Sequence, residues 1–454
     1  MELRVRMEPT GDSSRQSVMA KRVKKYKGVF GLKVMRNRNL IRLMLIVTAA
    51  AVATFGTRLA SGGTIGAQEH KLGPGGRIII TNPNGPISIT GWDKDVVKAV
   101  VEGEEGRPNG GLKIAEDSAA QGAIFISPDE GSERGGELHI VVQVPVSARI
   151  ERASTGSGDI VVNGVSGSTN IATGHGDVRI TNTGPISATS GDGRIVADHV
   201  SGSASLHTAS GDIRASGITG AAALISANGD LQAKDTGPLE ARSASGSITV
   251  ASVAGNATLQ TQSGDVDVKN VSGDLIGRVV SGDIRIESVS GLLNLAVTSG
   301  DVTVANNGGD IKITSISGGI HVVCAGGGVE VNTANGSINL SGIKGNVEAI
   351  STSGEVGFTG AIRANGRYRL KSTSGDVRMM VQPDPPGFTA ALSSYSGEID
   401  TIFPIHLDTP MQQGPVNRRI IGRFGDGRAE IRLDSFSGTV TLSKMKEGAA
   451  PNCK

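Results

Sequence analysis

Glycine recurs in this chain at a fixed spacing, and that spacing restricts the possible folds more than any other feature. From Gly246 to Gly354, every eighteenth position holds the Gly of a Ser-Gly-Asp-like triplet. Another Gly lies halfway along most units, so the underlying period is half as long. The triplet glycines are Gly158, Gly176, Gly191, Gly211, Gly229, Gly246, Gly264, Gly282, Gly300, Gly318, Gly336 and Gly354.

Apolar residues alternate with polar ones between these glycines, as in Ile248 and Val250 or Ile311 and Ile313. Such alternation of β-branched residues between Gly turns predicts short strands. A single half of the repeat cannot bury its own apolar face, but stacked coils bury it against copies about 4.8 Å away. We therefore expect an all-β fold, a single-domain parallel β-solenoid with about 18 residues and two short strands per coil. A propeller needs repeats of roughly 40–50 residues and is excluded.

The repeat is less regular at both ends of the chain, where caps are expected. Stacked repeats need atypical terminal units that cover the exposed core and the open strand edges. Strand-like runs such as 77–81 and 137–144 come before the first triplet, and Pro383 to Gly387 interrupts the pattern near the end. The expected organisation is a basic N-region with a signal peptide or signal anchor (1–67), a β-rich N-terminal cap (68–150), solenoid repeats (151–376), a C-terminal cap (377–445) and a disordered tail (446–454).

The N-terminal segment has the order of a secretory signal. The basic run ends at Arg42, the apolar run 43–56 follows, and mostly small residues lead to Ala67. The run is short for a membrane span, so cleavage and an uncleaved anchor both remain open. Either form places the bulk of the chain outside the cytoplasm: in the periplasm, on the outer surface, or anchored to the membrane by this segment.

Charge is distributed unevenly along the chain. The first 67 residues hold thirteen Lys and Arg but three acidic residues, so the remainder carries a net charge of about −8. Nucleic acid binding relies on clustered positive charge and is therefore not expected of this remainder.

An acidic column follows the triplet Gly, and it allows two interpretations. In the structural one, each Asp accepts hydrogen bonds from backbone N–H groups of its own turn. In the other, stacked carboxylates bind a ladder of calcium ions, as in nonapeptide repeats. The Gly-Gly-x-Gly-x-Asp pattern of those repeats is missing, which favours the structural interpretation and no cofactor. The candidates for the calcium ladder are Asp159, Asp177, Asp212, Asp265, Asp283 and Asp301.

A second column, three residues before the triplet Gly, carries hydroxyl groups. Thr155, Thr173, Thr261 and Ser351 belong to it, and Val279 is one of two interruptions. A flat Thr ladder could order water on ice, but mixed Ser, Thr and Val favour hydroxyls that hydrogen-bond along the coil axis.

Few other residues are candidates for a site. Cys324 lies in a strand-like run and is expected to be a buried small hydrophobic residue, whereas Cys453 lies in the tail; two cysteines make neither a disulfide framework nor a metal cluster. Trp92 is expected in the core of the cap, with a ligand platform as the alternative. His175, His199, His207 and His321 lack metal-ligand spacing.

The order Gly-Gly-Arg-Ile-Ile-Ile-Thr-Asn-Pro-Asn-Gly-Pro-Ile-Ser-Ile-Thr-Gly-Trp-Asp (75–93), then Val-Pro-Val (144–146), then Ser-Gly-Asp units, resembles the bacterial putative-adhesin family of β-strand-repeat proteins. The ending from Gly397 to Val440 is also similar to that family's close. The likeness covers about residues 70–445. It implies an exported solenoid of unknown function and no catalytic residues.

The sequence thus predicts an exported, adhesin-like, non-catalytic protein that contacts proteins or envelope polymers. A self-associating envelope scaffold is the alternative. A polysaccharide-acting solenoid enzyme is a weaker one, because acids are spread one per coil and no aromatic residue lies between Phe125 and Phe358.

Overall fold

The computed structural model describes residues 64–102, 111–117, 123–129, 137–408, 418–446 and 453, and each regular element among them is a β-strand. The signal segment expected within residues 1–67 lies almost wholly outside these residues. Within the described part of the chain, no helix is long and apolar enough to cross a membrane. The described strands all belong to one compact unit.

Thirteen consecutive coils form the regular part of this unit, and each coil gives one strand to each of two sheets. Sheet B contains β8 (Arg149–Ser157), β10 (Thr169–His175), β12 (Ile186–Ser190), β14 (Ala204–Ser210), β16 (Ala222–Asn228), β18 (Leu239–Ser245), β20 (Ala257–Ser263), β22 (Leu275–Ser281), β24 (Leu293–Ser299), β26 (Ile311–Ser317), β28 (Val329–Asn335), β30 (Val347–Ser353) and β32 (Arg367–Ser374). Sheet A contains β9 (Ile160–Asn163), β11 (Val178–Thr183), β13 (Ile195–Val200), β15 (Ile213–Ile218), β17 (Leu231–Thr236), β19 (Ile248–Val253), β21 (Val266–Val271), β23 (Ile284–Val289), β25 (Val302–Asn307), β27 (Ile320–Ala325), β29 (Ile338–Ile343), β31 (Val356–Gly360) and β33 (Val377–Val381).

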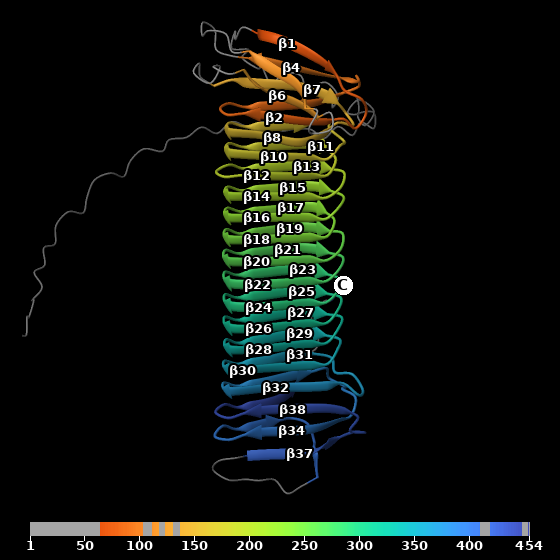
Figure 1. The fold of residues 1–454 in the computed structure, drawn as a ribbon. Coiled ribbons are helices and arrows are strands. Elements are labelled where there is room, and N and C mark those ends of the chain that lie inside the picture. The colour runs from red at the N-terminus through yellow and green to blue at the C-terminus, as the bar shows by residue number, and fades with distance from the viewer. Residues whose placement is uncertain are drawn as a thin grey trace, which may run out of the picture. The chain divides into compact units, whose positions relative to one another are not determined.

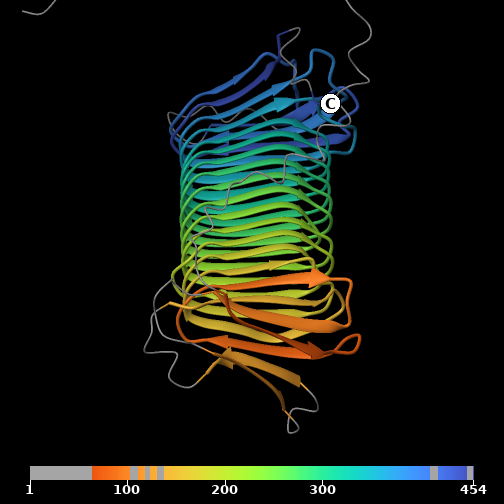
Figure 2. The ribbon, with the colours of Figure 1, turned by 90° about the horizontal axis from the view of Figure 1, so that it is seen from above.

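Neighbouring coils pair in parallel and in register, so each position of one coil lies over the same position of the next (Figures 1 and 2). Ile248 pairs with Val266, which in turn pairs with Ile284, one full repeat further along the chain. The predicted fold class, a parallel β-solenoid with two strands per coil and the period of the triplet glycines, is confirmed.

The core is a thin layer of aliphatic side chains between the two sheets. Val268 and Ile286 from sheet A and Leu275 and Ile313 from sheet B are all at most 1% exposed. Because these side chains repeat from coil to coil, burial is nearly the same in every coil and the apolar columns supply most of the stabilisation.

A corner of most regular coils has a left-handed backbone, usually six residues after the triplet Gly. Most such residues are Asn, Gly, Ser, His or Asp; Asn306 has φ 56° and Gly342 has φ 66°. Asn and Gly tolerate this conformation with little strain. Cys324, with φ 61°, occupies the same corner between them.

At the N-terminal end, the order of coils in space differs from their order in the chain. The strands are β1 (Thr64–Lys71), β2 (Arg77–Asn82), β3 (Ile87–Trp92), β4 (Val96–Glu102), β5 (Leu112–Asp117), β6 (Ala123–Pro128) and β7 (His139–Pro145). The β2–β3 coil lies between the β6–β7 coil and the β8–β9 coil. Antiparallel strands β5 on β6, and β4 with β1 on β7, extend the two sheets at this end (Figure 1).

The C-terminal end has the same kind of exchange. Its strands are β34 (Phe388–Ser394), β35 (Ile399–Thr401), β36 (His406–Leu407), β37 (Arg418–Phe424), β38 (Ala429–Ser435) and β39 (Val440–Lys444). The last coil of the chain, β38–β39, lies between β32–β33 and β34–β35, as Figure 1 shows for β38. Strand β37 pairs antiparallel with β34, and β36 pairs with β37.

The segments expected as separate caps, 68–150 and 377–445, therefore contain coils of the solenoid as well as antiparallel strands. The repeat is continued there by sequences in which the Ser-Gly-Asp triplet is weak or absent. For this reason the Gly spacing alone does not reveal these coils.

Candidate binding groove

The six Asp residues proposed for a calcium ladder lie at one turn of successive coils, and each uses a carboxylate oxygen to hold the next coil. The backbone N–H of Asp177 donates to Asp159 Oδ1 (2.8 Å), that of Asp301 to Asp283 Oδ1 (3.0 Å), and that of Gly319 to Asp301 Oδ1 (2.7 Å). Asp177, Asp212 and Asp265 accept in the same way from the coil that follows. The acceptor thus serves the following coil, not its own turn as expected.

A second column of the same kind lies at the halfway turns. There Asn256 Oδ1 accepts from the N–H of Asp274 (3.0 Å), and Asp310 Oδ1 accepts from that of Gly328 (2.7 Å). Because a neutral amide replaces the carboxylate at Asn256, the bond does not require a negative charge. Among the described residues, no cluster of three or more His, Cys, Asp or Glu could hold a metal ion.

The hydroxyl column points into the solenoid and is not a surface. Thr173 is 5% exposed, and its Oγ1 donates to the carbonyl of Gly158 in the preceding coil (2.9 Å). Ser351 donates to Gly336 in the same way (2.9 Å). The idea of a water-ordering Thr face is therefore wrong, because these hydroxyls are buried. Where both columns keep their residues, as at Gly229 and Asp230, the next coil fixes the triplet turn twice, once through its carbonyl and once through its Asp.

Trp92 and the histidines lie apart from one another. Trp92 is half-buried at the turn between β3 and β4, where its indole N–H donates to Val96 O (2.7 Å). His175 contacts Asp192 (2.9 Å), and His199 contacts Asp198 (3.1 Å), both at exposed positions. None of these side chains lines the groove on sheet B that is described next.

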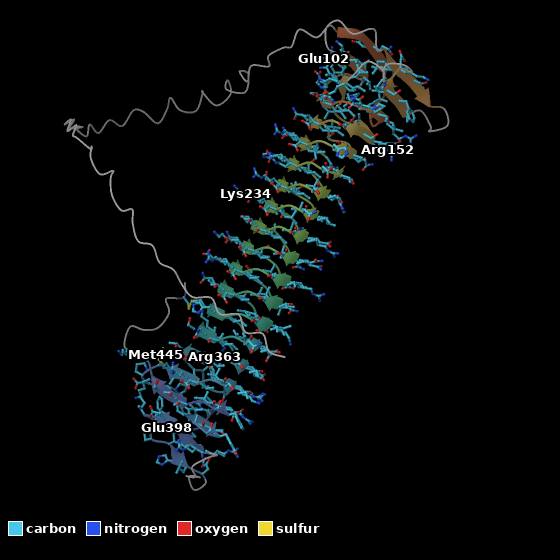
Figure 3. All side chains as sticks on the ribbon, turned by 90° about the vertical axis from the view of Figure 1, so that its left-hand side faces the viewer. Glu102, Arg152, Lys234, Arg363, Glu398 and Met445 are labelled. Carbon is cyan, nitrogen blue, oxygen red and sulfur yellow. A yellow bond between two sulfur atoms is a disulfide. The ribbon has the colours of Figure 1, made fainter. Side chains whose placement is uncertain are left out.

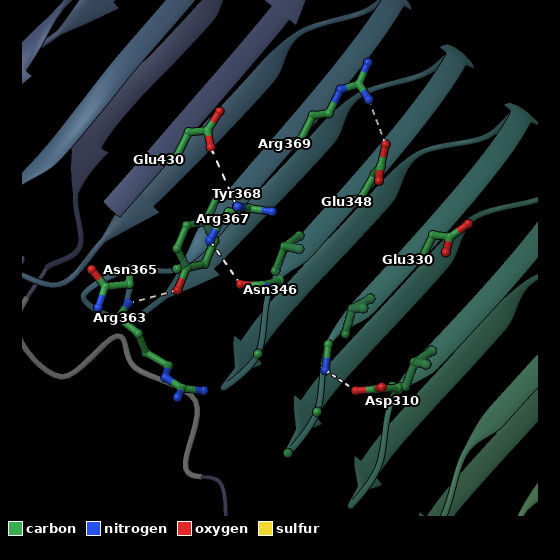
Figure 4. Close-up of a pocket in the computed structure, with 18 of the residues that line it drawn as sticks. Asp310, Glu330, Asn346, Glu348, Arg363, Asn365, Arg367, Tyr368, Arg369 and Glu430 are labelled. Atoms are coloured by element: carbon green, nitrogen blue, oxygen red, sulfur yellow. Dashed lines mark hydrogen bonds and ion pairs between the residues drawn. The ribbon is translucent and has the colours of Figure 1, made fainter. Parts of the chain in front are cut away.

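A groove of about 1210 Å³ lies on the outer face of sheet B, near its C-terminal end (Figure 4). Its floor is made by outward side chains of β26, β28, β30, β32 and β38. One wall is the connection 361–366 between β31 and β32, which is three residues longer than the repeat requires. The charged residues of the groove are Asp310, Lys312, Glu330, Glu348, Arg363, Arg367, Arg369, Glu430 and Arg432.

The wall is held in place by hydrogen bonds to the neighbouring coils. The Arg363 N–H donates to the Tyr368 hydroxyl (2.9 Å), and its guanidinium donates to the carbonyl of Lys344 (2.6 Å). The N–H of Ile362 donates to Gln382 Oε1 (2.8 Å). Tyr368 is 1% exposed, and this burial raises the pKa of its hydroxyl. The wall is therefore a defined part of the groove.

Ion pairs between neighbouring coils cross the groove floor. Lys312 contacts Glu330 (2.9 Å), and Arg369 contacts Glu348 (2.9 Å). Arg367 contacts Glu430 at 3.9 Å. All six side chains are substantially exposed, so each pair stabilises the fold by less than about 1 kcal/mol. Such weak pairs can exchange one partner for a charged ligand at low cost.

A disulfide lies on the opposite sheet. Cys324 Sγ bonds Cys453 Sγ, and the two residues are 129 positions apart in the chain. Cys324 is 8% exposed and therefore buried, as expected, but it is not a free thiol. Cys453, expected in a disordered tail, is held in place by this bond. The bond ties the end of the chain to β27, which β29, β31 and β33 separate from the last strand β39.

The sequence does hold signals for two of these features. Cys324 lies one repeat after Asn306 and one repeat before Gly342, so the period itself places it on an outward polar corner. The triplet spacing widens between Gly354 and Gly375, which is where the groove wall is inserted. The groove itself could not be predicted, because its floor combines β38 with β32, which are not consecutive in the chain.

The fold and its surface define a parallel β-solenoid with capped ends. The chain belongs to the Toastrack DUF4097 family, whose model matches residues 79–272, 221–329 and 325–443. This match confirms the resemblance seen in the sequence. A comparison with curated proteins gives no significant match.

Three solved structures are also similar. They are a putative cell adhesion protein from Clostridium sporogenes (8% identity, 84% of this chain and 100% of that chain, TM-score 0.15), a putative adhesin from Bacteroides fragilis (13%, 56% and 95%, 0.22) and a putative lipid binding protein from Parabacteroides distasonis (13%, 69% and 96%, 0.15). With TM-scores this low, these likenesses carry no argument about the function of this chain.

Proposed function

We propose that this chain is an exported, non-catalytic binding protein that holds an envelope polymer or a protein against the groove on sheet B. The observation that carries the proposal is the groove itself, where exposed charges of both signs from five coils face solvent beside a fixed wall. A surface of this kind offers many weak polar contacts along an extended ligand.

Export is supported by the disulfide between Cys324 and Cys453. Structural disulfides form and persist in oxidising compartments and are rare in the cytosol. The basic and apolar order of the N-terminal sequence is consistent with the same destination.

Cell fractionation with N-terminal sequencing of the exported form tests the location. Binding is tested by sedimenting the purified protein with isolated envelopes from the source cells. We expect wild-type protein to cosediment and Arg369→Glu to lose most binding, whereas Lys234→Glu, on the outer face of sheet A (Figure 3), should retain it.

Equal loss in both variants would indicate non-specific charge attraction and contradict the groove proposal. Concentration-dependent assembly into long species, without envelope binding, would instead favour a self-associating scaffold. Antiparallel strands cover sheet B at both ends and sheet A at its N-terminal end, which makes such assembly unfavourable because little parallel strand edge is left to stack upon. Turnover of acidic polysaccharides would overturn the non-catalytic assignment.

A further inference from the structure

Two aromatic rings are exposed side by side on the outer face of sheet B, next to the groove. Tyr395 follows β34 and is 44% exposed; Phe436 follows β38 and is 55% exposed. Their ring centroids are 4.6 Å apart and their planes differ by 4°. Stacking covers one face of each ring, and both side chains remain substantially exposed. Most described aromatic residues of this region, such as Phe358 and Phe388, are instead buried in the core.

Phe436 and Tyr395 both line a hollow of about 380 Å³. The hollow is lined by side chains of the neighbouring coils, including Arg369, Lys371, Ser393, Arg432 and Asp434. Ser393 on β34 is one of the lining residues, and its small side chain leaves space beside the two rings. Arg369 and Arg432 also line the larger groove, so the two depressions adjoin.

The hollow carries more positive than negative charge. Arg369, Lys371 and Arg432 face one carboxylate, that of Asp434. Arg432 Nε donates to Asp434 (2.8 Å), which raises the pKa of Arg432, so this guanidinium stays charged at any physiological pH. Lys371 forms no ion pair with any residue that the structure describes. This local excess occurs in a chain whose part beyond residue 67 has a net charge of about −8.

The combination selects one ligand chemistry. An aromatic face packs against the C–H face of a sugar ring, cations bind carboxylates, and Asp434 and Ser393 can accept or donate hydrogen bonds to hydroxyl groups. A neutral glycan would leave the cations unused, and a polyanion without rings would leave Phe436 unused.

We propose that this hollow binds a sugar unit of an acidic polysaccharide, and that the chain of sugars continues into the groove. This inference rests on the proposed binding function and names its ligand class. Phe436 stacks on the pyranose ring, Lys371 and Arg432 bind its carboxylate, and Tyr395 supports Phe436 from behind.

Binding to polygalacturonate measured by calorimetry tests this assignment, with dextran as the neutral polymer and polyglutamate as the polyanion without sugar rings. We expect binding of polygalacturonate alone at physiological salt. Phe436→Ala and Lys371→Ala should each weaken it about 10-fold. Ile316→Ala, which removes a 56% exposed side chain from the equivalent position in β26, and Lys234→Ala should change it less than 2-fold.

Equal binding of polyglutamate, or an unchanged affinity in Phe436→Ala, would overturn the sugar assignment, and equal binding of dextran would overturn the role of charge. If wild-type protein cosediments with envelopes but does not bind polygalacturonate, this inference fails while the proposed function stands. If it binds neither, both fail. Circular dichroism of each variant checks that the fold is retained.

Discussion

The middle coils and the C-terminal coils are built on the same period, yet they differ in what their surfaces can do. From β14 to β29, each residue lies beside the equivalent residue of the neighbouring repeat. The coils are stacked there in the order in which they follow one another in the chain. From β31 onward, neighbouring coils no longer carry equivalent residues at equivalent positions. The causes are a three-residue insertion, an exchanged coil and a group of aromatic residues.

The difference indicates how a repeat protein acquires a specific site. In a regular stack, every feature recurs in the next coil, so no place is distinct from its neighbours. The groove and the hollow lie where the period is broken, because only there do residues such as Arg363 and Phe436 have no copies beside them. We expect the two regions to differ in stability as well.

The largest effect is expected from the disulfide, which ties Cys453 to Cys324 in β27, next to the C-terminal coils. Cys324→Asn removes it and keeps a residue suited to the left-handed corner, as Asn306 shows. Closing a loop across 129 positions constrains the unfolded chain, so unfolding of the C-terminal coils should become easier by up to about 5 kcal/mol. Hydrogen exchange should accelerate from β28 to β39 and remain slow in β14 to β24.

Reductant provides the control, since it should reproduce this pattern in the wild-type protein and have no effect on Cys324→Asn. Uniform acceleration along the whole stack would contradict the separation of the two regions and indicate one cooperative unit.

Two adjacent glycines of a middle coil should respond very differently to the same substitution. Gly318 has φ 124°, and a Cβ there would overlap the Gly300 carbonyl of the preceding coil. Gly318→Ala should therefore cost about 3–4 kcal/mol in the free energy of unfolding. The first contact of a Cβ on Gly319 is Asp301 Oδ1 at 3.5 Å, so Gly319→Ala should change stability by less than about 0.5 kcal/mol. Urea unfolding compares the two, and similar losses would show that close coil contact is not the cause.

The Tyr368 hydroxyl is one of the groups that hold the groove wall in place. Tyr368→Phe leaves the Arg363 N–H without its acceptor and should cost about 1 kcal/mol. Because burial raises the pKa of Tyr368 above its usual value near 10, the folded state resists ionisation of this hydroxyl. Its contribution is therefore complete below pH 10 and is lost as the pH rises through the higher folded-state value. Wild-type stability should thus fall more steeply above pH 10 than that of Tyr368→Phe; parallel curves would refute this role.

The smallest effect is expected at the acidic column. Asp283→Ala removes the acceptor for the Asp301 N–H and should cost about 0.5–1 kcal/mol, whereas Asp283→Asn should be nearly neutral, as Asn256 fills the equivalent role. Calcium and chelator should leave the melting temperature unchanged. A rise with calcium that disappears in Asp283→Asn would restore the ion-ladder hypothesis.

The regular part of the fold could be predicted from the sequence, because one spacing sets every strand, turn and core column. Ile248 and its copies sufficed to predict the pairing. The sequence correctly predicts that the acidic column lies at the turns, but it places the N–H donor to each Asp in the same turn, whereas the donor belongs to the following coil. Spacing along the chain does not show which backbone N–H of the neighbouring coil points at the carboxylate.

The coil order at the two ends and the groove could not be predicted from the sequence, because both depend on the topology of the sheets. Coil exchange at β38–β39 depends on which of several similar strands pair, and their apolar patterns fit either order. The stack of Tyr395 on Phe436 follows from this exchange, since the two residues are far apart in the chain and become neighbours only when β38 lies beside β34.

The exchanged coil also bears on how the protein reaches its native state. Strands β34 and β35 leave the ribosome before β38 and β39, yet their native neighbours on the stack are those later strands. An early docking of β34 directly on β32 would have to be undone before the fold could close. Completion of this end must therefore wait until β38 and β39 have been made, so we expect these coils to close after the middle of the stack.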